Sequence, residues 1–289
     1  MSAVKRISTL LLVLVSLAGS QAGTTVDSAN RNAYGANVGW LDWYANGTDG
    51  ATIGAYVCSG YIYSANAGWI ILGSGSPANS IQYQNNSATD FGVNHDGLGN
   101  LSGYAYGASI GWITFEQAFG QPRVDLRTGI LSGSVWSANC GWISLSNAVA
   151  YVQTDSLYPG PLAPNGLPVP WLLACFGTTN VDANTDPTGK GMTIAQDYAA
   201  GTDPNDLGSG LRITSFAPGG TGVSLTWNSV ATRLYYVQKN PDLATANWTD
   251  SGLGLITPSA GSSTTSGFTD TNAPARFYRV RAVLPLTAP

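Results

Sequence analysis

The chain has 289 residues, enough for two domains of ordinary size. Only 10% of them are charged and the formal net charge is −4, whereas an ordinary soluble domain is about 25% charged. This balance, with no basic cluster, argues against a nucleic-acid binder. His95 is the single histidine, which excludes zinc sites with several histidines. The shortage of helix formers at helical spacing excludes a mostly helical protein.

The first 22 residues have the features of a secretory signal peptide. Lys5 and Arg6 supply positive charge, residues 7–17 form a short apolar stretch, and Ser20 and Ala22 are the small residues that a signal peptidase recognises. The stretch is too short to span a bilayer, which takes about 20 residues, and no later segment is suited to do so. The sequence therefore predicts an exported protein, secreted or at the cell surface, with no membrane span.

Export to an oxidising compartment raises the question of disulfides. Cys58, Cys140 and Cys175 allow at most one intramolecular bond, so the fold is not a disulfide scaffold. If a bond exists we favour Cys58 with Cys140, because both lie in the repeat region described next. Buried free thiols are the alternative.

Four segments in the first half of the chain align without gaps. Their sequences are NAYGANVGWLDW (32–43), YIYSANAGWIIL (61–72), YAYGASIGWITF (104–115) and SVWSANCGWISL (134–145). The tryptophans of the shared Gly-Trp step are 29, 43 and 30 residues apart, with a polar insertion at 73–90. In each segment a small polar run separates two stretches of β-favouring residues, which predicts an antiparallel hairpin.

The register of these hairpins follows from the side chains that it brings opposite one another. If the aromatic residue before the turn opposes the tryptophan after it, one face is aliphatic and the other aromatic. The aliphatic pairs are Ala33/Leu41, Ile62/Ile70, Ala105/Ile113 and Val135/Ile143, and the aromatic pairs are Tyr34/Trp40, Tyr63/Trp69, Tyr106/Trp112 and Trp136/Trp142. A shift by one residue would exchange the faces, so we expect the aliphatic face to form the core. The hairpins are compatible with a barrel, a sandwich or a propeller-like ring.

Two roles are open for the aromatic face. In the first, the rings pack between repeats or between sheets, where each pair contributes about 0.5–1.5 kcal/mol. In the second, half-exposed rings form a platform for the apolar faces of sugars, and Asp42, Thr114 and Ser144 beside them bind hydroxyl groups. The sequence favours packing, because repeats need a shared core before they can form a site. Exposure of at least three of the four tryptophans in one plane would favour glycan binding instead.

A change in composition marks the end of the repeat region. Residues 158–170 contain five prolines, which indicates a linker between domains. A short helix is expected at 171–176, with Pro170 at its start and Gly177 as a stop. A second helix is expected at 194–200, since Thr193 and Gln196 fit a capping box and Gly201 follows.

The segment between these two helices resembles a calcium-binding loop. Residues 186–197 have the length of an EF-hand loop with Gly191 at position six, and their frame resembles the EF-hand or thrombospondin type-3-like hinge of secreted bacterial surface proteins. The resemblance implies calcium as a cofactor. The loop departs from the family pattern at positions three, five and nine, which are Thr188, Lys190 and Ile194, and a lysine there would repel the ion. The residues left to hold calcium are Asp182, Asn184, Asp186 and Asp197, with Asp203 and Asp206 as a further pair; the alternative is a retained fold without the ion.

Five β-like stretches follow, at 211–216, 222–227, 234–239, 267–270 and 276–283. The alternation of Val223, Leu225 and Trp227 is typical of a half-buried strand, and turns recur about every 10 residues. The runs YYVQKNPDLATANWTD and TDTNAPARFYRVRA resemble the fibronectin-III-like tail of many such surface proteins, which implies a β-sandwich and identifies no site. The motif Y-[GS]-A-[NS]-x-G-W-[IL] resembles repeats of exported bacterial proteins and implies no particular activity.

The sequence offers little for catalysis. A glycosidase needs two facing carboxylates, and no acidic residue of the repeat region recurs at a fixed repeat position. His95 and Asp96 are the one adjacent pair suited to acid–base chemistry, in an expected turn where a solvated histidine is the commoner outcome. No catalytic residue is therefore predicted.

The sequence thus predicts an all-β protein with a signal peptide (1–22), a four-copy hairpin domain (23–153), a helix-loop-helix hinge with its linker (154–206) and a β-sandwich (207–289). The expected function is non-enzymatic, structural or adhesive, at the cell surface or outside the cell. The first alternative is a carbohydrate-binding protein that uses the Trp/Tyr pairs, with a glycan or cell-surface polymer as partner. The second alternative is a polysaccharide-acting hydrolase. Apart from calcium no cofactor is expected, and the oligomeric state stays open.

Overall fold

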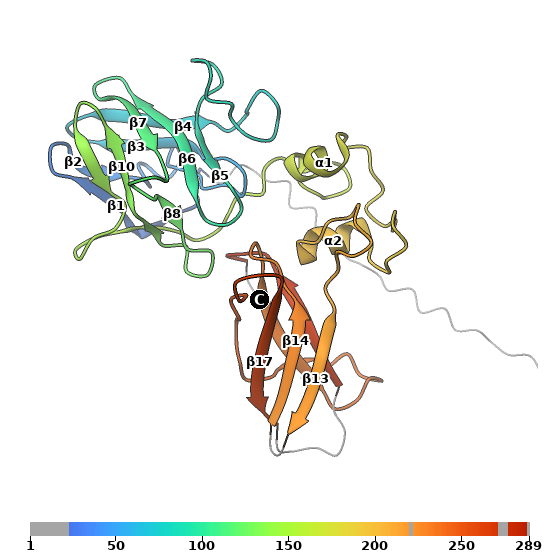
Figure 1. Ribbon diagram of the computed structural model, residues 1–289. Helices are drawn as coiled ribbons and strands as arrows, with labels where there is room; N and C mark the ends of the chain where they lie inside the picture. The colour runs from blue at the N-terminus through green and yellow to red at the C-terminus, as the bar shows by residue number, and fades with distance from the viewer. Residues whose placement is uncertain (1–22, 220–221, 271–276, 288–289) are drawn as a thin grey trace, which may run out of the picture.

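The computed structural model describes residues 23–219, 222–270 and 277–287, so the expected signal peptide lies outside the described residues. Strands dominate these ranges and only two short helices interrupt them, which confirms the all-β class (Figure 1). Among the helices of the described ranges, none is long and apolar enough to cross a membrane.

Eight strands form a closed barrel, and each predicted repeat supplies one hairpin of it. The hairpins are β1 (Val26–Gly35) with β2 (Gly39–Asp42), β3 (Ser59–Ser64) with β4 (Gly68–Ser74), β6 (Leu101–Gly107) with β7 (Gly111–Phe115), and β10 (Ser134–Ser137) with β11 (Gly141–Ser144). Each strand pairs antiparallel with the next, and β11 pairs back to β1, which closes the sheet. Of the three architectures that the sequence left open, the hairpins adopt the barrel (Figure 1).

Four further short strands accompany the barrel. β5 (Val93–His95) pairs with β6, and β12 (Val152–Thr154) pairs with β1. β8 (Arg123–Val124) and β9 (Leu131–Ser132) form a separate two-stranded sheet. The first two residues of the insertion at 73–90 extend β4 and the rest is a loop. The buried Tyr83 anchors this loop by donating a hydrogen bond from its hydroxyl to the Cys58 carbonyl at 3.2 Å.

The predicted register is confirmed in all four hairpins, pair by pair. The register between neighbouring hairpins is also the same at each of the four seams. The residue two positions after each tryptophan faces the aromatic residue before the next turn: Asp42 faces Tyr63, Ile71 faces Tyr106, Thr114 faces Trp136 and Ser144 faces Tyr34. Because each hairpin pairs with the next in the same register, the four hairpins are related by the same step, and together they complete a closed ring.

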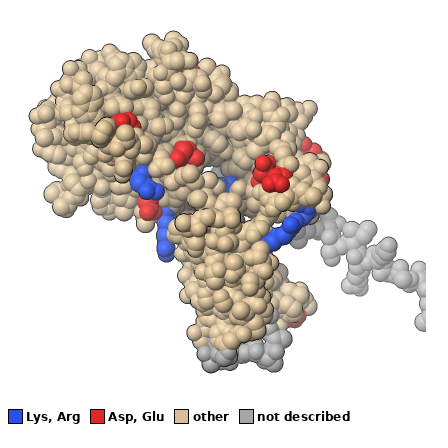
Figure 2. All heavy atoms as spheres, viewed as in Figure 1, with Lys and Arg blue, Asp and Glu red and all other residues tan. Residues whose placement is uncertain are grey.

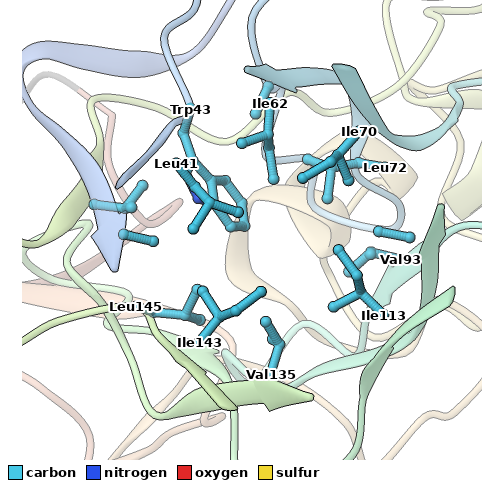
Figure 3. Close-up of a cluster of buried hydrophobic side chains, with 14 of the residues drawn as sticks. Leu41, Trp43, Ile62, Ile70, Leu72, Val93, Ile113, Val135, Ile143 and Leu145 are labelled. Atoms are coloured by element: carbon cyan, nitrogen blue, oxygen red, sulfur yellow. The ribbon is translucent and has the colours of Figure 1, made fainter. Parts of the chain in front are cut away.

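The aliphatic face fills the inside of the barrel, as predicted (Figure 3). All eight aliphatic pair members are at most 3% exposed. A second layer comes from the residue three positions after each tryptophan: Trp43, Leu72, Phe115 and Leu145, all buried. Since side chains fill the interior of an eight-stranded barrel, a binding site on this domain is expected on its outer surface.

The four turns are tied to one another at one end of the barrel. Asn66 donates from its side-chain amide to the Val38 carbonyl of the preceding turn at 3.1 Å, and Asn139 makes the same bond to Ile110. Asn37 of the first turn reaches Cys140 of the last one at 3.1 Å. The third turn has Ser109 in place of asparagine, so three of the four links are present.

Two short helices form the predicted hinge. α1 (Val169–Phe176) ends at Gly177, which has a left-handed φ of 67°. α2 (Ile194–Ala200) has the predicted Thr193/Gln196 capping box and ends at Gly201. The range of α2 is confirmed, and α1 is confirmed except that it starts at Val169, two residues earlier than expected. The two helices enclose a small buried cluster around Leu172 and Ile194.

The tail consists of two three-stranded sheets around a core of their own. One sheet contains β13 (Ile213–Gly219), β14 (Gly222–Asn228) and β17 (Ser263–Thr269), and the other β16 (Thr249–Asp250), β15 (Leu234–Asn240) and β18 (Phe277–Val283). The expected alternation in β14 is confirmed, because Val223, Leu225 and Trp227 are buried. The short strand β16 was not predicted.

The favoured Cys58–Cys140 disulfide is absent, because all three cysteines are free thiols. Cys140 belongs to the last barrel turn, where its side chain packs in the core, and Cys58 is buried beside β5. Burial raises the pKa of the Cys58 thiol to about 12. Both side chains thus act as small apolar core residues.

Candidate functional site

The aromatic residues predicted as a platform lie on the outside of the barrel. We call them the aromatic belt: Tyr34, Trp40, Tyr63, Trp69, Tyr106, Trp112, Trp136 and Trp142. The four tryptophans that follow the turns are 46–49% exposed, and their four partners are 38–42% exposed. The sequence favoured packing of these rings between repeats or between sheets, which would bury them, whereas among the described residues all eight rings stay more than one third exposed. The belt is therefore an open surface.

The belt faces in several directions. Each tryptophan follows the turn glycine of a different hairpin, and the four turns lie together at one end of the barrel. The pairs consequently surround that end, one to each quarter of the ring, so they do not lie in one plane. The tryptophans are thus exposed, as a glycan platform requires, but they do not form a single flat platform.

Three of the pairs repeat the same ring geometry. The ring centroids of Tyr34 and Trp40 are 4.9 Å apart at an interplanar angle of 59°. The corresponding values are 5.1 Å and 60° in the second hairpin, and 5.0 Å and 59° in the third. The fourth hairpin substitutes Trp136, which is the register partner of Trp142. A constant tilt means that each pair offers a ligand the same angled aromatic surface.

The surroundings of the pairs differ. Trp112 also contacts Phe91 at 4.9 Å and Tyr104 at 6.0 Å between ring centroids, which makes the third pair the largest aromatic surface. Trp69 has one additional neighbour, Tyr61, at 6.0 Å. The first pair has neither addition among the described ring contacts.

Polar side chains stand beside three of the four pairs across the seams. They are Asp42 beside Tyr63, Thr114 beside Trp136 and Ser144 beside Tyr34; Ile71 takes this place in the remaining seam. Charged groups are sparse on the barrel face seen in Figure 2. The belt is thus aromatic with isolated hydroxyl and carboxylate groups, and has little net charge.

His95 is not the solvated turn residue that was expected. It ends strand β5 and is only 1% exposed. Its Nδ1 lies 3.0 Å from the Gly54 carbonyl oxygen, and its Nε2 accepts a hydrogen bond from the Gly99 N–H at 3.1 Å, which places the proton of a neutral ring on Nδ1. Burial lowers the pKa of His95, although the negative charge of Asp96 acts to raise it. The histidine therefore links two loops through its ring nitrogens, and it is almost completely buried.

The residues predicted to hold calcium are separated by their own contacts. Asp182 accepts hydrogen bonds from the backbone N–H and the side-chain amide of Asn184. Asp186 accepts bonds from backbone N–H groups of its own loop, and these hold its pKa below the ordinary value although desolvation acts to raise it. Asp197 is fully buried and pairs with Lys190. Within the described ranges no three acidic, histidine or cysteine side chains gather into a group that could hold a metal ion.

A cavity of about 690 Å³ lies where the barrel, the hinge and the tail meet. Tyr56, Trp171, Tyr198 and Arg233 contribute to its wall. The Arg233 guanidinium lies over the Tyr198 ring at 5.6 Å and donates to the Ala199 carbonyl at 3.0 Å, at the end of α2. These residues come from four distant segments without a shared motif, which is why the sequence did not single them out. Since the arginine donates to the backbone carbonyls of Tyr198 and Ala199, it connects the tail to α2 of the hinge.

Comparison with known proteins finds no matching family model, no matching curated protein and no matching solved structure.

Proposed function

We propose that this chain is an exported, non-enzymatic adhesive protein that attaches to neutral carbohydrate through the aromatic belt. The observation on which the proposal rests is the half-exposure of four tryptophans at equivalent positions around a closed barrel. Large aromatic rings that stay open on a well-packed domain typically mark an interaction site. Repetition of the tilted pair in three hairpins adds to this, because packing alone does not require it.

The chemistry of the belt suits sugars. One face of a pyranose ring presents C–H groups that pack against an aromatic ring, and its hydroxyl groups seek hydrogen bonds at the rim. Tyrosine hydroxyls within the pairs and the Thr114 side chain beside them suit those bonds. Asp42 and Ser144 also stand beside pairs, but Asp42 Oδ1 already accepts two backbone N–H groups and the Ser144 hydroxyl donates to the Ser146 carbonyl. A net charge of −4 and only twelve basic residues favour an uncharged glycan over an acidic one.

The contacts of four carboxylates of the barrel domain support a role without catalysis. Asp42, Asp90, Asp96 and Asp125 each accept hydrogen bonds from backbone N–H groups in turns or loops. Their positions are thereby explained by turn formation. A pair of facing carboxylates for glycoside hydrolysis finds no support in these contacts.

The distribution of the pairs favours adhesion over capture of one short ligand. Four sites that face in different directions allow one molecule to contact more than one polymer strand. Linked weak sites bind a polymer more tightly than a single site does, because the later contacts become intramolecular. We therefore expect weak binding of oligosaccharides and much stronger retention on an insoluble polysaccharide.

A glycan array on the full chain, followed by calorimetry with the oligosaccharide that binds best, tests the proposal. Wild type should bind several equivalents of a short neutral oligosaccharide. Trp112→Ala should remove one site, and the joint replacement of Trp40, Trp69, Trp112 and Trp142 by alanine should abolish binding. Phe119→Ala is the matched control, because this side chain is 81% exposed on the same domain outside the belt. Equal binding by wild type and the fourfold variant, or no bound glycan at all, would contradict the proposal.

A further inference from the structure

Lys190 occupies position five of the loop that resembles a calcium site, and its side chain is fully buried. The ammonium Nζ lies 2.9 Å from the Asp197 Oδ1 at position twelve of the same loop. It also donates to the backbone carbonyls of Asp203 and of Asp206, the latter at 3.3 Å. A positive charge is thus enclosed by three oxygen atoms.

The contacts satisfy this ammonium group completely. A lysine ammonium has three N–H donors and no acceptor, and here each donor has one oxygen partner. Carboxylate and backbone carbonyl oxygens are also the ligands that calcium takes in loops of this kind. The site therefore still binds a cation, but this cation is the ammonium group of Lys190.

Asp197 shows why a cation is needed at this point. Its side chain is fully buried, and its Oδ1 accepts a further hydrogen bond from the Thr202 hydroxyl at 2.5 Å. Within the described part of the chain, its Oδ2 has no hydrogen-bond partner. A buried carboxylate without a neighbouring positive charge is strongly unfavourable, so the hinge requires either a metal ion or an ammonium group beside Asp197.

We infer that the Lys190 ammonium takes the place of the calcium ion, so that the hinge folds without calcium and excludes it from this loop. The rest of the loop keeps the expected form: Asp186 accepts the Gly191 N–H at 2.6 Å, and α2 starts directly after Thr193. A divalent ion at the same point would be repelled by the ammonium group and would find its acidic ligand already paired. The candidate residues Asp182, Asn184, Asp186 and Asp197 therefore hold the loop together without a metal.

Calcium titration of the full chain tests the first half of this inference. We expect no binding heat at millimolar calcium, and the same thermal unfolding midpoint in calcium and in chelator, because a ligand that does not bind the folded state cannot stabilise it. A midpoint that rises with calcium or falls with chelator would overturn the inference.

Two substitutions test the second half. Lys190→Met keeps the length of the side chain and removes its charge, so the unfolding midpoint should fall by at least about 5 °C. Arg31→Met is the control: its Nε lies 3.4 Å from the Asp42 Oδ1, but the two side chains are 35% and 23% exposed, so a smaller fall is expected. An unchanged midpoint in Lys190→Met would overturn the inference.

Lys190→Asp should be destabilised in chelator and should regain stability with calcium. An unfolding midpoint of this variant that does not change with calcium would count against a cation site. Should that variant not fold, the titration of wild type and Lys190→Met still decide.

Discussion

The barrel and the hinge are stabilised by different kinds of interaction. The barrel encloses a cluster of 25 buried residues, to which all four repeats contribute, whereas the hinge cluster has five. With so little apolar surface to bury, the hinge depends on one enclosed ion pair, Lys190–Asp197, and on helix caps. The barrel thus distributes its stability over equivalent positions, while the hinge concentrates it at a single point.

The largest effect is expected in the barrel core, at Trp43. Trp43→Ala should lower the free energy of unfolding by about 3–5 kcal/mol, because the cavity left between strands cannot collapse. Trp43→Phe should cost much less, since the buried indole N–H has no hydrogen-bond partner among the described residues. Urea unfolding followed by circular dichroism measures both. If the two variants were equally unstable, the role assigned to core volume would be wrong.

In the hinge, a single hydroxyl group should matter. Thr202→Val removes the hydrogen bond to Asp197, and a bond to a charged group contributes about 1.5–3 kcal/mol. The loss should be local, so amide hydrogen exchange of α2 should accelerate while that of the barrel strands stays unchanged. Faster exchange throughout the chain would contradict the separation of hinge and barrel.

The barrel should also respond to pH through its buried histidine. Because burial lowers the pKa of His95 in the folded state, the unfolded chain binds one more proton just below the unfolded pKa of about 6.5. Stability is therefore complete above that pH and falls on acidification, with a slope of up to about 1.4 kcal/mol per pH unit. Unfolding titrations between about pH 5 and 7 test this, and His95→Gln should remove the slope because the chain has no other histidine.

The smallest effects on stability are expected at the four turns, where they test whether equivalent positions contribute equally. Asn139→Ala should cost about 1 kcal/mol by removing one link between turns. Ser109→Asn should add the missing link and stabilise by a similar or smaller amount. Space is available, because a Cβ added at Gly68 would meet no atom within 4 Å, whereas at Gly39 it would meet the Asn66 amide at 3.1 Å. Thermal unfolding of the two variants should shift in opposite directions.

The hairpins and their register could be predicted because residues close in sequence determine them. Ala105/Ile113 and Tyr106/Trp112 segregate correctly in only one register, and four copies give the same answer. Closure could not be predicted, because it depends on seams such as Ser144 with Tyr34, which join the two ends of the repeat region. The exposure of the belt depends on closure of the barrel, so it could not be predicted either.

The hinge illustrates a different limit. The capping box of α2 and the stop at Gly177 are local signals and were predicted. Lys190 was interpreted as a side chain that repels an ion, because the sequence does not reveal the carbonyls of Asp203 and Asp206 that surround it. Asp197 was assigned as a metal ligand for the same reason. In both cases the partners lie on a loop whose path is determined only by the folded chain.

Closure of the ring has a consequence for the history of this domain. An open array can gain or lose a unit by unequal recombination and keep its neighbours intact, whereas here the first hairpin is also the neighbour of the last. Removing or inserting one unit would leave unpaired strand edges or require a new curvature for every other strand. Geometry thus opposes a change in copy number, and descendants of this gene are expected to diverge within the units more readily than to gain or lose one.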